Sequence, residues 1–312
     1  MRSLEPSLGD GLISCVIDED PEFHLEALRW FATATRLASV PPSALRIHVI
    51  GDIDSDVVRW LVREGVVVRH VDRFDVRSPH CNKISGALSI AEERFSGVIV
   101  LTDADIGFLE DPRALEFAHG SLAGKIVDGP NPRGERLENV FRAAGLPVPG
   151  RLRPDFDDSD FTVEGNLNGG FYAMRGPVLS KLAPAWARWA RWLLERPELL
   201  GESATFTDQV GMALALVSEQ VPWHPLGARW NTPTHMAEWL PAHVEPPAII
   251  HYHKEVEPTA LLARRGHQVV DRAIDVVNDA VAHVLNTYFP SETFREWRTR
   301  HDPEFGSESE PG

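Results

Sequence analysis

The stretch VIVLTDADIGFLEDP, residues 98–112, decides the fold that this sequence predicts. Its apolar run, residues 98–101, is rich in β-branched residues and follows a glycine, which is typical of a buried strand in a parallel sheet. Asp103 and Asp105 follow at once. While the backbone stays extended, this spacing projects both carboxylates to one side of the chain. Ligands of open α/β sheets bind at the carboxyl ends of the strands, so the stretch predicts a polar site there.

The acid pair has two interpretations. A pair of hard oxygen ligands suits a divalent cation such as Mn²⁺ or Mg²⁺. An Asp-x-Asp taken anywhere in a chain is more often a solvated acidic turn, because acids are common on protein surfaces. Directly after a fully apolar strand we favour the first interpretation, which makes Asp103 and Asp105 candidate metal ligands.

The composition is that of an ordinary soluble globular protein. The 312 residues are 43% hydrophobic and 25% charged, enough for a large core in one or two domains. A formal net charge of −15 argues against nucleic acid or an anionic membrane as a partner. No apolar run is long enough for a transmembrane segment, and acids and a proline replace the apolar region of a signal peptide. A cytoplasmic location is therefore expected.

Strand and helix alternate along the first part of the chain, which predicts βαβ units and a parallel sheet. The expected strands are 11–17, 45–52, 66–72 and 98–101, and the expected helices are 21–39, 55–64 and 82–94. Residues 119–164 lose this pattern and are rich in proline, glycine and charge. There we expect an insertion, either a functional lid or a disordered excursion, with one short helix around 137–144.

Regular structure returns after this insertion. The elements expected there are a strand at 171–174, a helix bearing three tryptophans, a helix capped by Thr205 or Thr207, a strand at 248–251 and a helix at 267–288. The ends of the chain, residues 1–10 and 301–312, are expected to be disordered.

The late strand ends in His251, His253 and Lys254. A divalent ion held by two carboxylates needs more ligands, and a histidine at the end of a separate strand can reach a shared site. A lone histidine is more often structural. The pattern leaves a metal or phosphate role and a structural role open.

Five short motifs occur along the chain in a fixed order. They are Asp103 with Asp105; Asn168, Gly169, Gly170 and Phe171; Asp208 with Gln209; Trp230 with Asn231; and His251 followed by Lys254. This order resembles that of nucleotide-diphosphosugar glycosyltransferases of the GT-A fold. It is most similar to the retaining group that includes glycogenin and the bacterial lipopolysaccharide galactosyltransferases, and it spans residues 11–255. The resemblance implies a Rossmann-like α/β fold with a single, mostly parallel central sheet flanked by helices.

The resemblance implies a metal-dependent transfer of sugar from a UDP- or GDP-sugar donor to an acceptor hydroxyl. Asp103, Asp105 and a late histidine, His251 or His253, would hold Mn²⁺ or Mg²⁺ at the two donor phosphates. The cation would act as a Lewis acid that stabilises the leaving nucleoside diphosphate. It would also explain how an acidic protein binds an anionic donor.

The resemblance also implies roles for the other motif residues. Asp103 would approach the ribose as well as the metal, and Asp18 would contact the nucleoside. Lys83 would contact the diphosphate or sugar, and Lys254 would pair with a phosphate. Asn168, Gly169 and Gly170 would line the sugar pocket, Asp208 and Gln209 would face the anomeric carbon, and Trp230 and Asn231 would contact acceptor or sugar. The chain would then divide into a nucleotide-sugar-binding half (11–118), the insertion (119–164), an acceptor and catalytic half (165–257) and a C-terminal helical segment (258–300).

Two departures from the family pattern leave alternatives open. The late motif reads HYHKEVEP, where the family usually has a glycine after the histidine and then Lys-Pro, so the metal ligand is His251 or His253. Val210 stands where the helix motif usually has a second acid. Asp208 is then either the general base of an inverting displacement or a bystander in a retaining reaction, and we favour retention.

Two other functions are compatible with parts of this sequence pattern. A phosphohydrolase of the haloacid dehalogenase type also uses Asp-x-Asp after a strand, but on its first strand, whereas three expected strands precede Asp103. A non-catalytic nucleotide-sugar-binding scaffold would keep the fold and lose turnover. The intact pair of Asp103 and Asp105 argues against the scaffold, and the altered late motif keeps it open.

Overall fold

The structure, a computed structural model, describes residues 11–51, 55–157, 159–241, 243–257 and 259–288. The two chain ends that the sequence predicts to be disordered, residues 1–10 and 301–312, lie outside the described residues. None of the helices within these ranges combines the length and the apolar character that crossing a membrane requires.

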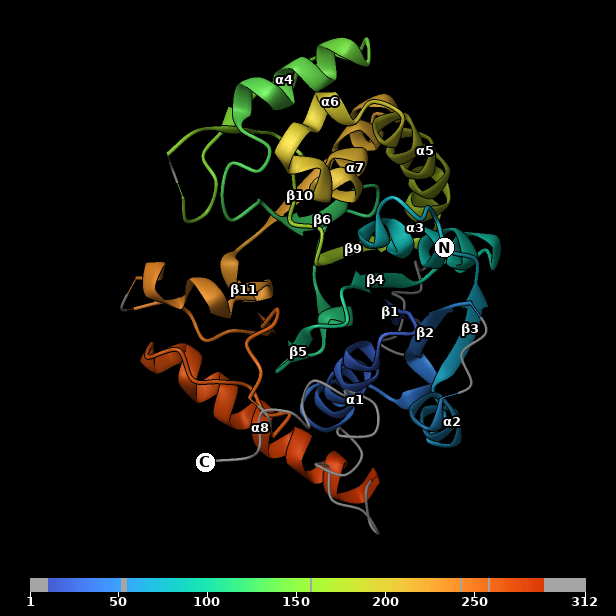
Figure 1. Cartoon of the computed structure of the whole chain (residues 1–312), viewed down its shortest axis with the longest axis vertical. Coiled ribbons are helices and arrows are strands. Elements are labelled where there is room, and N and C mark those ends of the chain that lie inside the picture. The colour runs from blue at the N-terminus through green and yellow to red at the C-terminus, as the bar shows by residue number, and fades with distance from the viewer. Residues whose placement is uncertain (1–10, 52–54, 158, 242, 258, 289–312) are drawn as a thin grey trace, which may run out of the picture.

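A seven-stranded sheet forms the centre of the molecule, in the order β10-β6-β9-β4-β1-β2-β3 (Figure 1). The strands are β1 (Leu12–Ile17), β2 (Leu45–Ile50), β3 (Val67–Val71), β4 (Val98–Thr102), β6 (Leu122–Lys125), β9 (Phe171–Arg175) and β10 (Trp223–Leu226). Only β9 runs antiparallel to its neighbours, β4 and β6, and the other neighbouring pairs are parallel. The prediction of a mostly parallel central sheet is confirmed.

Side chains alternate along the strands and enter two apolar cores, one on each face of the sheet. In β1, Ile13, Cys15 and Ile17 pack into one core and Leu12 into the other. The first core is covered by α1 (Pro21–Arg36), α2 (Asp56–Arg63) and α8 (Gln268–Tyr288). The second is covered by α3 (Asn82–Glu92), α5 (Gly176–Leu194) and α7 (Thr207–Ser218). The expected arrangement of helices on both faces is therefore present (Figure 1).

The segment 119–164 is more regular than its sequence indicates. It contains the expected short helix, α4 (Gly134–Ala143), which begins three residues earlier than predicted and packs with α6 (Pro197–Leu200). It also contains a two-stranded ladder of β7 (Arg151–Leu152) and β8 (Thr162–Val163). None of the expected strands corresponds to this ladder or to β6, which is a full member of the central sheet. Its sequence, LAGK, has a glycine and a lysine in four residues and so lacks the apolar signature of a strand.

A second, small sheet lies beyond the end of β4. It consists of β5 (Ile106–Phe108), β11 (Thr232–Pro233) and β12 (Ile249–His251). β12 is antiparallel to β5, with His251 opposite Ile106, and the backbone N–H of Tyr252 donates to the carbonyl of Asp105 at 3.1 Å. This register sets the late histidine beside the second acid of the Asp-x-Asp pair.

Helix α1 fixes the end of β4 just before this pair. The indole Nε1 of Trp30 donates to Oγ1 of Thr102 at 2.9 Å, and both residues are buried. The Trp30 ring also meets Phe108 of β5 edge to face, with ring centroids 5.8 Å apart. The two strands on either side of the acids are thus held by one tryptophan.

Replacing Thr102 by valine keeps the shape of the side chain but leaves the Trp30 N–H buried without an acceptor. We expect Thr102→Val to lower the free energy of unfolding by about 1–3 kcal/mol, measured by urea denaturation. Thr35→Val is the matched control, because the Thr35 hydroxyl only donates to a carbonyl of its own helix. Equal losses in the two variants would contradict the proposed anchoring role of Trp30.

Candidate active site

The two acids of the Asp-x-Asp pair lie at the carboxyl end of β4 and have different partners. β4 ends at Thr102, and the chain bends before β5 begins at Ile106. The backbone N–H of Asp103 donates to the carbonyl of Gly170 at 3.1 Å, which ties the bend to the loop before β9. The Asp103 carboxylate turns to Lys83, whereas that of Asp105 turns to the histidines.

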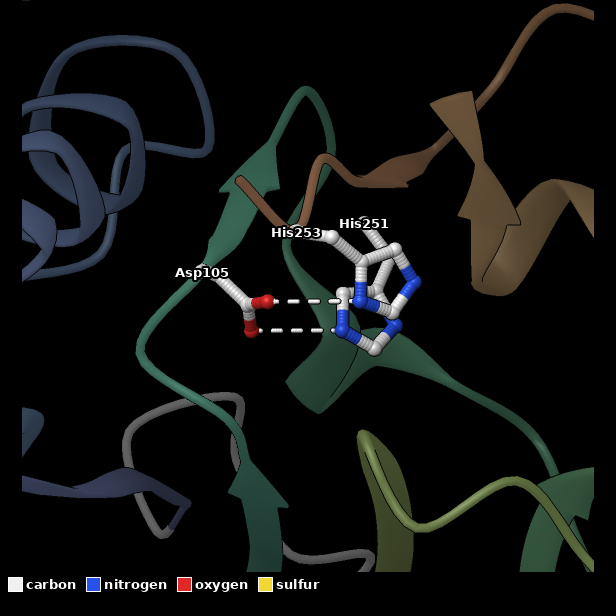
Figure 2. Close-up of side chains that lie close together, drawn as sticks. All are labelled: Asp105, His251 and His253. Atoms are coloured by element: carbon white, nitrogen blue, oxygen red, sulfur yellow. Dashed lines mark ion pairs between the residues drawn. The ribbon is translucent and has the colours of Figure 1, made fainter. Parts of the chain in front are cut away.

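Asp105, His251 and His253 form a cluster whose ligand atoms lie within 4.8 Å of one another (Figure 2). Oδ1 of Asp105 is 3.2 Å from Nε2 of His251, and Oδ2 is 3.6 Å from Nδ1 of His253. The two imidazole rings stack with centroids 3.9 Å apart. His253 has a positive φ of 48°, in the left-handed region that non-glycine residues seldom occupy. Both histidines therefore direct a ring nitrogen at the same carboxylate.

The charges of this cluster follow from burial and proximity. Burial opposes ionisation of Asp105, but the charge of His251 and its hydrogen bond outweigh it and lower the pKa of the carboxyl. Burial likewise opposes a charge on His251, but Asp105 raises its pKa. Burial and the neighbouring His251 lower the pKa of His253 to about 3. His253 is thus neutral, and its Nε2 is buried with no hydrogen-bond partner among the described residues.

Lys83 lies in the first turn of α3 and connects Asp103 with Asp208, which are predicted to serve the metal site and the anomeric carbon, respectively. Its Nζ lies 2.5 Å from Oδ1 of Asp103 and 3.1 Å from Oδ2 of Asp208. It also donates to the carbonyl of Gly169 at 3.0 Å. Burial alone would lower the pKa of Lys83, but the two carboxylates raise it. Burial raises the pKa of Asp103, against the opposing influence of Lys83. The result is a buried ammonium shared by two acids.

Asp208 and Gln209 open α7, as the sequence predicts, but the helix cap is different. Thr207 is the first helical residue rather than the cap, and its hydroxyl donates to the carbonyl of Ala204 at 2.7 Å. Trp186 of α5 donates from Nε1 to the carbonyl of Asp208 at 2.6 Å. This bond gives one of the three tryptophans a positioning role behind the site.

The amide side chains are held in a fixed network. Gln209 accepts from the backbone N–H of Gly169 at 3.3 Å and donates from Nε2 to the carbonyl of Asn131 at 3.1 Å. Asn231 donates from Nδ2 to Oδ1 of Asn168 at 3.1 Å, and its own Oδ1 lies 3.1 Å from Nδ1 of His251. The network therefore joins His251 to the loop that contains Gly169 and Gly170, here called the glycine loop.

The two glycines of that loop are required by close contacts. A Cβ on Gly170 would lie 2.4 Å from Cε1 of His251, and one on Gly169 would lie 3.1 Å from Oδ2 of Asp208. The sequence predicts small residues here so that a ligand can approach the backbone. In the structure, the loop already packs against side chains of the site.

Three predicted positions stand apart from these groups. Asp18 directly follows β1, and its Oδ2 lies 4.0 Å from a guanidinium nitrogen of Arg73. Lys254 is exposed, and no ion pair among the described residues joins it to Asp103 or Asp105. Trp230 is half-buried beneath Arg229, whose guanidinium lies 5.2 Å from the ring centre. Their expected contacts with nucleoside, phosphate and acceptor remain predictions.

Sequence reasoning missed three residues beside the site. Lys125, at the end of β6, is fully buried and ion-paired with Asp128, and Nδ2 of Asn168 donates to Asp128 at 2.6 Å. The ring of His235 meets that of His253 edge to face at 4.2 Å. Asp128 follows only two apolar residues, Ile126 and Val127, so the sequence carries no strand signal that marks it as Asp103 is marked.

The fold and the site together define a class of protein. A mostly parallel seven-stranded sheet with helices on both faces is the GT-A fold of glycosyltransferases, and the Asp-x-Asp pair lies at the end of its strand β4. Solved structures support the fold. The galactosyltransferase LgtC, in complex with donor and acceptor sugar analogs, matches 92% of this chain over 99% of its own length, with a TM-score of 0.52 and 14% identity.

Two further solved structures have a similar fold. An active-site mutant of LgtC gives a TM-score of 0.55 at 12% identity and covers 92% of this chain and 98% of its own. Mouse xyloside xylosyltransferase 1 in its apo form gives a TM-score of 0.51 at 14% identity and covers 78% of this chain and 98% of its own. At these identities the likeness shows the fold alone.

Residues 24–220 match the Rhodobacterales glycosyltransferase domain, and the chain belongs to this family. No curated protein matches the chain. The matched region includes the Asp-x-Asp pair, the glycine loop and the start of α7, and it ends before His251. The phosphohydrolase alternative is therefore set aside.

The contact between Gly170 and His251 leads to a stability prediction. The His251 ring is held by Asp105 on one side and Asn231 on the other, so it cannot move away from an added methyl group. We expect Gly170→Ala to lower the free energy of unfolding by about 1–3 kcal/mol in urea denaturation. Gly120→Ala, where a Cβ meets nothing within 4 Å, is the control. An unchanged Gly170→Ala variant would show that the loop can rearrange freely.

Proposed function

We propose that this glycosyltransferase moves a sugar from a nucleotide-diphosphosugar, a UDP- or GDP-sugar, to an acceptor hydroxyl, with retention of anomeric configuration and with the help of a divalent cation. The observation that carries the proposal is the adjacency of two charged groups. Asp105 with its two histidines offers cation ligands, and Lys83 with Asp103 and Asp208 lies beside it. A diphosphate with its leaving oxygen needs both kinds of partner.

The residues of the Asp105 cluster fit a divalent cation. An ionised carboxylate and a neutral His253, whose Nδ1 lies 3.6 Å from Oδ2 of Asp105, are suitable ligand groups. Two imidazoles with one carboxylate suit Mn²⁺ better than Mg²⁺, which prefers an all-oxygen shell. We propose that Asp105, His251 and His253 hold the cation and that Asp103 contributes from the adjoining turn. Once bound, the cation would supply Lewis-acid stabilisation to the departing diphosphate.

The chain's own residues would carry out the remaining tasks. The Lys83 ammonium, with its raised pKa, is charged and positioned to bind a donor oxygen by a charge-assisted hydrogen bond. Gln209 and Asn168 fix the loop of Gly169 and Gly170, whose backbone would line the sugar pocket. Asp18 and Lys254 would contact the nucleoside and a phosphate, and Trp230 with Asn231 the acceptor side.

Retention is favoured by the state of Asp208. A general base of an inverting reaction must be free to take the proton of the acceptor hydroxyl. Asp208 is buried and ion-paired with Lys83 at 3.1 Å, and Val210 stands where a second acid could have replaced it. The acceptor proton would instead pass to the departing phosphate on the same face of the sugar.

The metal and donor parts of the proposal are tested by ligand-induced stability. Thermal unfolding is measured with a panel of nucleoside diphosphates and nucleotide sugars, with and without Mn²⁺. We expect one donor to stabilise the protein only when Mn²⁺ is present, by about 2.7 kcal/mol at a hundred times its dissociation constant. Asp105→Asn should abolish this stabilisation, because it removes the carboxylate shared by both histidines.

Asp275→Asn on α8 is the matched control, because Asp275 pairs with Arg264, in a separate ion pair. Stabilisation that does not depend on Mn²⁺ or survives Asp105→Asn would contradict the metal site. Binding without turnover of the donor would favour the scaffold alternative over a transferase.

The stereochemical part is tested on the product. With the donor that the panel identifies, we expect the first-formed product to keep the anomeric configuration of the donor, measured by proton NMR before mutarotation. A product of opposite configuration would overturn retention and assign Asp208 as the general base of an inverting enzyme.

A further inference from the structure

A chain of polar contacts runs from the interior of β6 to the candidate metal ligand His251. It begins at Lys125, whose side chain is 0% exposed and is ion-paired with Asp128. Asp155 lies 3.4 Å from the same ammonium. Nδ2 of Asn168 donates to the second oxygen of Asp128 at 2.6 Å. A buried ammonium thus holds a carboxylate whose remaining oxygen faces an amide.

The direction of each amide in this chain follows from its partners. A carboxylate only accepts hydrogen bonds, so Asn168 must present its NH₂ group to Asp128. The backbone N–H of Gly170 only donates, and it meets Oδ1 of the same amide at 2.9 Å. The two contacts require the same orientation of Asn168.

This orientation is transmitted to the imidazole. Because Oδ1 of Asn168 faces outward, Asn231 presents its Nδ2 there, at 3.1 Å. Its Oδ1 is then left for Nδ1 of His251, also at 3.1 Å, and an amide oxygen can only accept. His251 must therefore carry a proton on Nδ1, and Nε2 is the nitrogen that faces Asp105.

We propose that Asp128, held by Lys125, is a positioning residue that acts through Asn168 and Asn231 to hold the His251 ring by its Nδ1–H, with Nε2 directed into the metal site. The metal half of this statement rests on the proposed function. Such outer partners fix the ring orientation of metal-binding histidines and are commonly worth about 10–100-fold in affinity.

The first test locates the proton and needs neither metal nor turnover. In the ¹⁵N-labelled native protein at neutral pH, a one-bond proton–nitrogen signal is expected from Nδ1 of His251, assigned by its loss in His251→Gln. In Asp128→Asn, the single oxygen of the new amide goes to the Lys125 ammonium and its NH₂ group faces Asn168. The chain of amides is then frustrated, so the Nδ1–H of His251 no longer faces an amide oxygen, and its signal should shift and broaden because the proton exchanges faster with water. An Nδ1 without a proton in the native protein overturns the proposal.

The second test measures Mn²⁺ alone, by electron paramagnetic resonance titration. We expect Asp128→Asn to weaken binding by about tenfold or more. Asp155 pairs with the same lysine, but among the hydrogen bonds of the described residues none joins it to Asn168. Asp155→Asn should therefore bind Mn²⁺ as the native protein does.

A double variant separates positioning from a merely structural role. Asn168→Leu removes the amide through which Asp128 reaches Asn231, so the direction of Asn231 no longer depends on Asp128. Adding Asp128→Asn to this variant should cost little further affinity, whereas a structural role would give the same loss in both backgrounds and overturn the proposal. A native protein that shows the Nδ1–H signal but binds no Mn²⁺ supports the proton assignment and overturns the metal-dependent function instead.

Discussion

The antiparallel pairing of β5 with β12 is the constraint on which the candidate site depends. β5 starts one residue after Asp105, and β12 ends at His251, so the register of this short ladder alone decides that the two side chains meet. A slip of one residue would turn the histidine to the opposite face. The register is fixed from both sides, since Trp30 packs on β5 and β11 pairs with β12. A few buried residues of a small sheet thus define the position of the ligands.

Charge compensation explains how a chain of net charge −15 can offer a site to an anionic donor. Each acid at the end of β4 has a cationic partner within the protein: Asp105 pairs with His251, and Asp103 pairs with Lys83, which it shares with Asp208. Burial makes an unpaired charge costly, so these pairs are needed for the fold to tolerate the acids at all. The same cations lie beside the place proposed for the diphosphate. Local charges, rather than the overall charge, would therefore govern attraction for the proposed donor.

The strands and helices of the first half were predictable because their apolar periodicity is strong and their lengths are ordinary. The acid pair was predictable for a related reason: it follows a fully apolar strand directly. β6 was not predicted, since LAGK contains two residues that are unusual in strands, and burial of Lys125 depends on its ion pairs with Asp128 and Asp155. The sequence indicated His251 and His253 but could not choose between them, because the choice depends on the β5–β12 register and on the positive φ of His253.

The polar contacts of the site also explain why no part of it can be varied independently. β9 comes from the later half of the sequence, yet it lies between β4 and β6, so the two proposed halves share one sheet. The loop before β9 carries Asn168, which binds Asp128 on one side and Asn231 on the other. Because Asn231 in turn faces His251, the residues proposed to line the sugar pocket and those proposed to hold the cation form one hydrogen-bonded body. A donor bound as proposed would therefore act on the ligand geometry through these hydrogen bonds.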